Sequence, residues 1–109
     1  MRRCALVCLL AASGPAWLFG GPLLGRISYQ GRALSGASIE ISCPGGGGRG
    51  STLDDGSYRI NVQVRGNCTM TVNSPAGAVS APVVSSAGAA EYNFVVVPKP
   101  GGGWELRRQ

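Results

Sequence analysis

The chain has 109 residues, of which 18 are glycine and none is histidine, and its formal net charge is +5. This length allows one small domain, and the lack of histidine removes the commonest general base and the commonest metal ligand. With 14% charged and 44% hydrophobic residues, the composition argues against a disordered chain.

The first segment has the layout of a secretory signal peptide. Two arginines follow Met1, and the run CALVCLLAA over residues 4–12 is an apolar core segment. Residues 13–16 (SGPA) break a helix and offer small side chains to a peptidase, which predicts cleavage after Ala16. We therefore assign residues 1–20 to a signal peptide and expect a periplasmic or secreted protein.

The alternative for the same segment is an uncleaved signal anchor. No charged residue lies between Arg3 and Arg26, so residues 4–25 reach the length of about 20 residues that spans a bilayer. The glycine and proline residues at 14–15 and 20–22 oppose one continuous helix. Membrane association is expected only if this segment stays uncleaved. In either case residues 21–25 are expected to form a linker to the domain.

From residue 26 onward, apolar and polar residues alternate with a period of two, and glycine-containing turns interrupt the alternation. No window has the spacing of an amphipathic helix. The pattern predicts about seven short strands, over residues 26–30, 37–43, 51–53, 58–65, 68–73, 79–83 and 91–96. Since each strand has one apolar face, we expect an all-β fold, a small antiparallel Greek-key-type β-sandwich over residues 26–97.

Three segments depart from this alternation. Pro82 interrupts the run over 79–83, which predicts an edge strand because proline cannot donate a hydrogen bond to a neighbouring strand. The glycine-rich residues 44–50 are expected to form a flexible loop. Residues 98–109 contain PKPGGG and are expected to form a flexible C-terminal tail, in which Trp104 is an exposed aromatic side chain.

The cysteines agree with export. Cys4 and Cys8 leave with the leader, so Cys43 and Cys68 remain and are expected to form a disulfide. The alternatives are half of an intermolecular metal site and a redox pair, but the spacing is too long for C-x-x-C chemistry and no histidine completes a zinc site. Both cysteines lie on apolar strand faces, so we expect the bridge to cross the core.

The basic charge lies outside the predicted domain. Residues 26–97 carry five arginines against four acidic residues, a net charge of +1, and the remaining positive charge sits in the leader and the tail. Phosphate binding requires a concentrated basic face. Nucleic acid is therefore not an expected partner.

Two motifs resemble a known family. Residues 25–41 read GRISYQGRALSGASIEI, which fits the family pattern L-x-G-A-x-V-x-V with Leu34, Gly36, Ala37, Ile39 and Ile41 in the defining places. Residues 52–58 read TLDDGSY against T-D-x-x-G-x-Y, with Leu53 in place of the usual aspartate. Over residues 25–97 the chain resembles the carboxypeptidase regulatory-like domain, a β-sandwich related in shape to transthyretin. The resemblance implies an accessory module in an exported protein and no particular activity.

The sequence gives no catalytic, cofactor or metal site. The glycine-rich stretch has Ser51 where a phosphate-binding loop requires lysine, and strands follow it where that loop requires a helix. Asp54 and Asp55 offer too few oxygen atoms for calcium. With no histidine, and with Lys99 in the predicted tail, no base is placed to activate a serine, so we expect a protein that is not an enzyme.

Binding remains as the expected role. Four aromatic residues lie on inward strand faces and are expected in the core: Tyr29, Tyr58, Tyr92 and Phe94. We expect an exported non-catalytic module that acts through protein contacts or as a structural accessory domain. Its expected partner-binding residues are Trp104, Arg107 and Arg108. The edge strand that contains Pro82 and the 44–50 loop are two further candidate contact surfaces. The alternative is a module of the periplasm or cell surface that binds carbohydrate or a small hydrophobic ligand.

Overall fold

The computed structural model describes residues 20–109, so the predicted signal peptide lies almost wholly outside the described residues. The described residues form strands and turns, and they include no helix long and apolar enough to cross a membrane. The strands are β1 (Pro22–Tyr29), β2 (Arg32–Ala33), β3 (Ser38–Cys43), β4 (Gly46–Ser51), β5 (Ser57–Asn61), β6 (Gly66–Ser74), β7 (Gly77–Ser85), β8 (Ala90–Glu91), β9 (Phe94–Pro98) and β10 (Trp104–Arg108).

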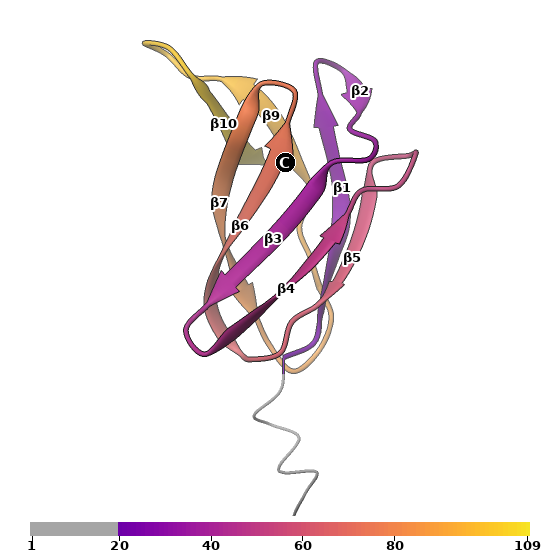
Figure 1. Ribbon diagram of the computed structural model, residues 1–109, viewed down its shortest axis with the longest axis vertical. Helices are drawn as coiled ribbons and strands as arrows, with labels where there is room; N and C mark the ends of the chain where they lie inside the picture. Colours follow the sequence, from indigo (N-terminus) through magenta and orange to yellow (C-terminus); the bar gives the residue numbers. More distant parts are fainter. Residues whose placement is uncertain (1–19) are drawn as a thin grey trace, which may run out of the picture.

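The strands form two sheets that face each other (Figure 1). One sheet has the order β10-β9-β1-β2, with β5 and β8 also paired to β1, and the other has the order β4-β3-β6-β7. The predicted all-β sandwich is confirmed, and β7 is an edge strand as Pro82 indicated. The pairing is antiparallel except that β1 runs parallel to β8 and β9, which strand alternation alone could not reveal.

The alternation of side chains along each strand explains which residues form the core. Inward-facing residues of β6 and β7 alternate with exposed ones, so that Met70 and Val72 are inaccessible to solvent while their neighbours are exposed or half-buried. The largest fully buried side chains come from both sheets: Leu23, Ile27, Ile41, Ile60, Met70, Val72, Val83, Phe94 and Val96. Each such side chain stabilises the fold by roughly 1.5–3 kcal/mol when it leaves water.

The glycine-rich segment is a strand, which corrects the predicted flexible loop. β4 pairs along its length with β3, and the Gly47 carbonyl accepts a hydrogen bond of 3.3 Å from the Gln63 N–H. A Cβ at Gly48 would lie 2.6 Å from the Asn61 carbonyl oxygen and 2.8 Å from Ile60 Cγ2. Glycine is therefore required for the close approach of β4 to the segment that contains β5.

The C-terminal residues are also ordered, which corrects the predicted tail. The Lys99 N–H donates a 2.9 Å hydrogen bond to the Gly103 carbonyl and closes a hairpin between β9 and β10. Leu106 on β10 is only 6% exposed because it packs into the core cluster. The N-terminal boundary moves too, since β1 begins at Pro22 inside the predicted linker.

The disulfide joins Cys43 to Cys68, with their Cα atoms 4.3 Å apart. It does not cross the core, because β3 and β6 are neighbours in one sheet: Cys43 follows Ser42, Cys68 precedes Thr69, and Ser42 is paired with Thr69. Alternation places both side chains on the inner face, but it cannot distinguish adjacent strands from opposed sheets. The bridge therefore fastens two strands of the four-stranded sheet to each other.

Candidate functional site

The predicted partner-binding residues all lie on β10, but on two faces. Trp104 is half-buried, its ring 5.6 Å from the Tyr29 ring, so it is not the exposed aromatic that the sequence indicated. Arg107 is exposed and forms a 2.6 Å ion pair with Glu105. Arg108 lies with Leu106 and Trp104 on the other face, because side chains alternate along a strand.

Arg108 lines a groove between the edge strands β7 and β10, which lie on the same side of the sandwich (Figure 1). Its volume is about 420 Å³. The lining is mostly apolar: Cys68, Ala81, Val83, Phe94 and Leu106 contribute from the core, and Pro82 and Val84 from the exposed side of β7. Val84 is 48% exposed, so a large apolar side chain faces water at this groove.

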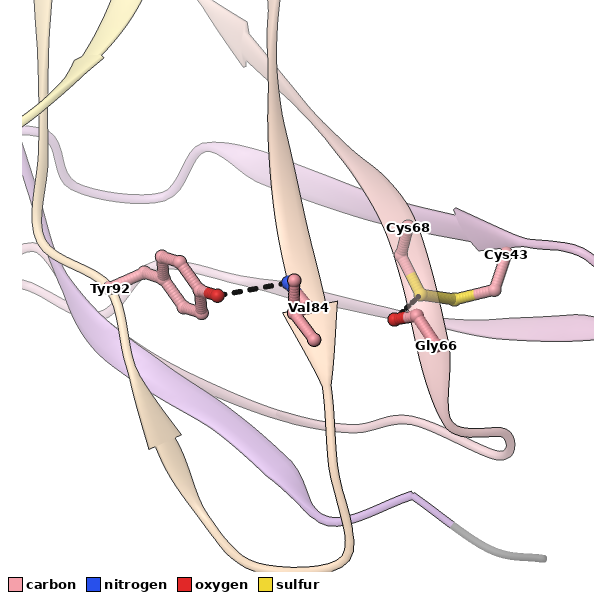
Figure 2. The surroundings of a disulfide bond; sticks show 5 residues. All are labelled: Cys43, Gly66, Cys68, Val84 and Tyr92. Carbon is pink, nitrogen blue, oxygen red and sulfur yellow. Dashed lines mark hydrogen bonds between the residues drawn. A yellow bond between two sulfur atoms is a disulfide. The ribbon is translucent and has the colours of Figure 1, made fainter.

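Tyr92 connects the two sheets at this groove. Its hydroxyl accepts a 2.9 Å hydrogen bond from the Val84 N–H on β7, as Figure 2 shows. Its carbonyl oxygen accepts a 2.7 Å hydrogen bond from the Tyr58 hydroxyl. Burial, followed by the proximity of Tyr92 and Glu91, raises the pKa of Tyr58 above its usual range, so this donor stays protonated.

Aromatic and cationic contacts complete the wall of the groove. The Tyr92 and Phe94 rings are nearly parallel, 8° apart in plane and 6.0 Å between centroids. The Arg108 guanidinium carbon lies 4.4 Å from the centroid of the Tyr92 ring, within the range of a cation–π contact. The groove thus combines an apolar floor with one positive charge at its rim.

The disulfide lies beside the groove, on the inner side of the sheet to which β7 belongs (Figure 2). Cys68 is buried and contributes to the lining, whereas Cys43 is half-buried. The Gly66 carbonyl oxygen lies 3.5 Å from Cys68 Sγ. Because a disulfide sulfur carries no proton, this is a contact without a donated hydrogen bond.

The other residues considered from sequence form a turn. The Asp55 carboxylate accepts hydrogen bonds from the Ser57 hydroxyl at 2.6 Å and from the Ser57 N–H at 3.0 Å. These bonds lower the pKa of Asp55 below its ordinary value of 3.8. Within residues 20–109, no three histidine, cysteine or acidic side chains lie close enough to hold a metal ion.

Sequence reasoning did not find the groove or the role of Tyr92. Alternation placed Tyr92 on an inward face but could not show that its hydroxyl reaches another sheet. The bond crosses from the segment between β8 and β9 to β7, which depends on how the two sheets pack. The one available signal was a tyrosine close to an edge strand that is interrupted by proline.

No family model matches the chain, and no curated protein matches it. Among solved structures, it is similar to 5-hydroxyisourate hydrolase from Klebsiella pneumoniae, with a TM-score of 0.60 and 17% identity, over 82% of this chain and 98% of that one. It is also similar to a DUF3823 family protein from Parabacteroides merdae, with a TM-score of 0.55 and 18% identity, over 84% of this chain and 47% of that one. At these identities the likeness shows the fold, and it is consistent with a transthyretin-like β-sandwich.

Proposed function

We propose that the chain is an exported, non-catalytic β-sandwich module that acts through protein contacts at the groove between β7 and β10. The observation that carries the proposal is the groove itself, an apolar surface rimmed by the half-exposed Val84 and by the Arg108 guanidinium. Apolar surface that opens to water beside an oriented cation is typical of a contact site.

Export is supported by the disulfide and by the leader-like sequence of the first 20 residues. Disulfides persist in oxidising compartments and are rare in the cytosol. The motifs over residues 25–41 and 52–58 support an accessory module of the carboxypeptidase regulatory-like kind, since modules of this kind occur in many exported proteins. We therefore place the chain in the periplasm or outside the cell.

The chemistry of the groove supports binding over catalysis. Arg108 and Tyr92 are its ionisable side chains apart from Cys68, which is held in the disulfide. The whole chain contains no histidine, so an acid–base pair of the usual kind has no source here. The hydrolase activity named for the Klebsiella protein belongs to that protein.

A second candidate is a site for a small hydrophobic ligand. A groove of about 420 Å³ is within the size range of small-molecule sites. The two functions differ in what contacts Val84: a macromolecule covers this exposed side chain, whereas a small ligand occupies the space between Val83 and Leu106 below it.

The test is photocrosslinking in the cells that export the protein. A photoreactive amino acid replaces Val84 in one variant and Leu53 in the control, because Leu53 is a second exposed apolar side chain, 65% accessible, at a turn that does not line the groove. We expect one protein to be captured from position 84 and not from position 53. Adding Arg108→Ala should reduce this capture.

Each other outcome has a definite meaning. Equal capture from both positions, or none from either, would refute a protein contact at the groove. Capture of a lipid or metabolite from position 84 alone would replace the protein by the small-ligand function. Capture of only the chain itself would assign the groove to contacts between copies.

A further inference from the structure

The chain enters the domain through a narrow gap between two segments, just before the start of β1 at the lower end of the sandwich (Figure 1). One side of the gap is formed by residues 62–64, which follow β5, and the other by residues 85–88 at the end of β7. Gly21 is buried there, and a Cβ on it would lie 2.6 Å from the Gly88 carbonyl carbon. The entry to the domain is therefore enclosed by protein on both sides.

Three oxygen atoms surround the α-carbon of Gly20. A Cβ on Gly20 would contact Ser85 Oγ and would lie 2.5 Å from the Val64 carbonyl oxygen and 2.8 Å from the Val62 carbonyl oxygen. Ser85 is 2% exposed, and its hydroxyl has no hydrogen-bond partner among the described residues. Both carbonyls follow the end of β5, and no backbone hydrogen bond between described residues reaches them. The gap thus holds three oxygen atoms that can accept hydrogen bonds.

A fourth acceptor is already bound to the nitrogen of Gly21. The Gly21 N–H donates a 2.5 Å hydrogen bond to the Ser86 carbonyl, and a peptide nitrogen has no second proton to donate. An α-ammonium group at the same nitrogen would carry three protons. Without residue 20, the space of its atoms opens, and the two additional protons can reach Ser85 Oγ and the carbonyls of residues 62 and 64. An unpaired hydroxyl in the interior is unfavourable, and this ammonium would pair it.

We propose that the leader is removed between Gly20 and Gly21, and that the new α-ammonium group of Gly21 is held in this gap. The reaction is a hydrolysis, with water as the co-reactant: the Gly20–Gly21 peptide bond breaks, the leader keeps a carboxylate on Gly20, and the domain gains an amine that is protonated at neutral pH. β1 begins at Pro22, so the cut leaves both sheets complete. This inference rests on the export part of the proposed function, because it requires a leader that is removed.

The cut after Gly20 differs from the cut after Ala16 that the sequence pattern predicts. Cleavage after Ala16 would leave the large apolar residues 17–19 (WLF) at the start of an exported protein. Gly20 also supplies a small residue immediately before the scissile bond. Because Gly21 is buried in the folded domain, a peptidase must reach this bond before the domain folds, as a peptidase that acts during export does.

The first experiment determines where the exported protein begins. The protein is purified from the cells that export it, and its N-terminus is read by intact mass and terminal sequencing. We expect the sequence to begin GPLLGR, from Gly21 onward. An exported chain that begins at Trp17, or at any other residue, would overturn the inference and leave export intact. A chain that stays in the cytosol with its leader attached would refute export itself, and the inference with it.

The second experiment tests whether the gap holds the new amine. A chain that begins at Gly21 has two amines, the α-amine and the exposed side chain of Lys99, which serves as an internal control. An exposed α-amine reacts faster than a lysine at neutral pH, because a larger fraction of it is unprotonated. Reductive methylation with isotope-labelled formaldehyde measures both rates by NMR. We expect the α-amine to react about tenfold more slowly in the folded protein than in urea, because its protons are donated to the gap, whereas the rate of Lys99 should change little.

A matched pair of variants assigns this protection to the hydroxyl in the gap. Ser85→Ala removes that hydroxyl and should speed methylation of the α-amine. Ser86→Ala is the control, because the Ser86 side chain is exposed and the substitution keeps the carbonyl that binds the Gly21 nitrogen. Circular dichroism verifies that each variant is folded. If Ser85→Ala does not fold, the comparison of the native protein with and without urea still decides. Equal rates of α-amine methylation in folded and unfolded native protein, or in the two folded variants, would overturn the binding of the amine.

Discussion

At the scale of single residues, Tyr92 shows how one side chain can hold two sheets together. Its ring stacks against Phe94, its hydroxyl accepts the Val84 N–H, and its carbonyl accepts the Tyr58 hydroxyl. The hydroxyl satisfies a backbone donor that would otherwise face outward from the edge strand β7. A single oxygen atom thus ties the segment before β9 to β7 at Val84.

Removal of the Tyr92 hydroxyl oxygen should lower the free energy of unfolding. Tyr92→Phe leaves the Val84 N–H without its acceptor, and we expect a loss of about 0.5–1.5 kcal/mol in the free energy of unfolding. Urea denaturation at low protein concentration measures this loss in the free energy of unfolding. Tyr29→Phe is the matched control, because the Tyr29 side chain makes a ring contact and no hydrogen bond within residues 20–109. Equal losses in the two variants would show that the bond to Val84 contributes nothing.

At the scale of elements, β4 is a strand in which four of the six residues are glycine. Such a strand has little intrinsic preference for the extended state, and its interior glycines weaken it. It forms because it pairs with β3 on one side and lies against β5 on the other, where side chains would clash. The absence of Cβ atoms is therefore required for the packing of β4 against β5.

A methyl group between β4 and β5 should destabilise the folded domain. Gly48→Ala sets a Cβ 2.6 Å from the Asn61 carbonyl oxygen, and overpacking of this kind costs about 1–3 kcal/mol. Gly88→Ala is the control, since a Cβ at Gly88 meets nothing within 4 Å. Thermal unfolding of both variants measures the difference. If Gly48→Ala unfolds at the same temperature as Gly88→Ala, the close approach of β4 to β5 is wrong.

At the scale of the whole molecule, the described domain of 90 residues, from 20 to 109, relies on a disulfide as well as on its core. Small domains bury a limited fraction of their surface, so a covalent link adds a large share of their stability. The bridge joins β3 to β6, the two central strands of the four-stranded sheet. It therefore fastens the sheet whose edge strands are the glycine-rich β4 and β7, which borders the groove.

Loss of the disulfide should weaken the entire domain. The bridge closes a loop with a sequence separation of 25 residues, and the double variant Cys43→Ala with Cys68→Ala should lose about 3 kcal/mol of unfolding free energy. Chemical denaturation with and without reductant measures this loss. Reductant should destabilise the native chain and leave the double variant unchanged. A double variant as stable as the oxidised native chain would contradict this role.

Much of the fold could be predicted from the sequence because it depends on neighbouring residues. The period-two alternation determined which residues of β3, β6 and β7 face inward, and turn residues separated the strands. The Asp55 turn and the inward Tyr58 followed from the same local rules. The two cysteines were identified as a pair because they are the two that lie outside the leader-like segment.

Only the tertiary structure decided how these strands meet. The alternation of Cys43 and Cys68 was compatible with adjacent strands or opposed sheets, and the register of β3 with β6 selected the former. Residues 44–50 and 98–109 carried breakers, yet pairing with β3 and β9 holds them as strands. The groove depends on the separation of β7 and β10, which no local pattern encodes. Local rules fix which way a side chain points, whereas contacts between distant segments fix what it meets.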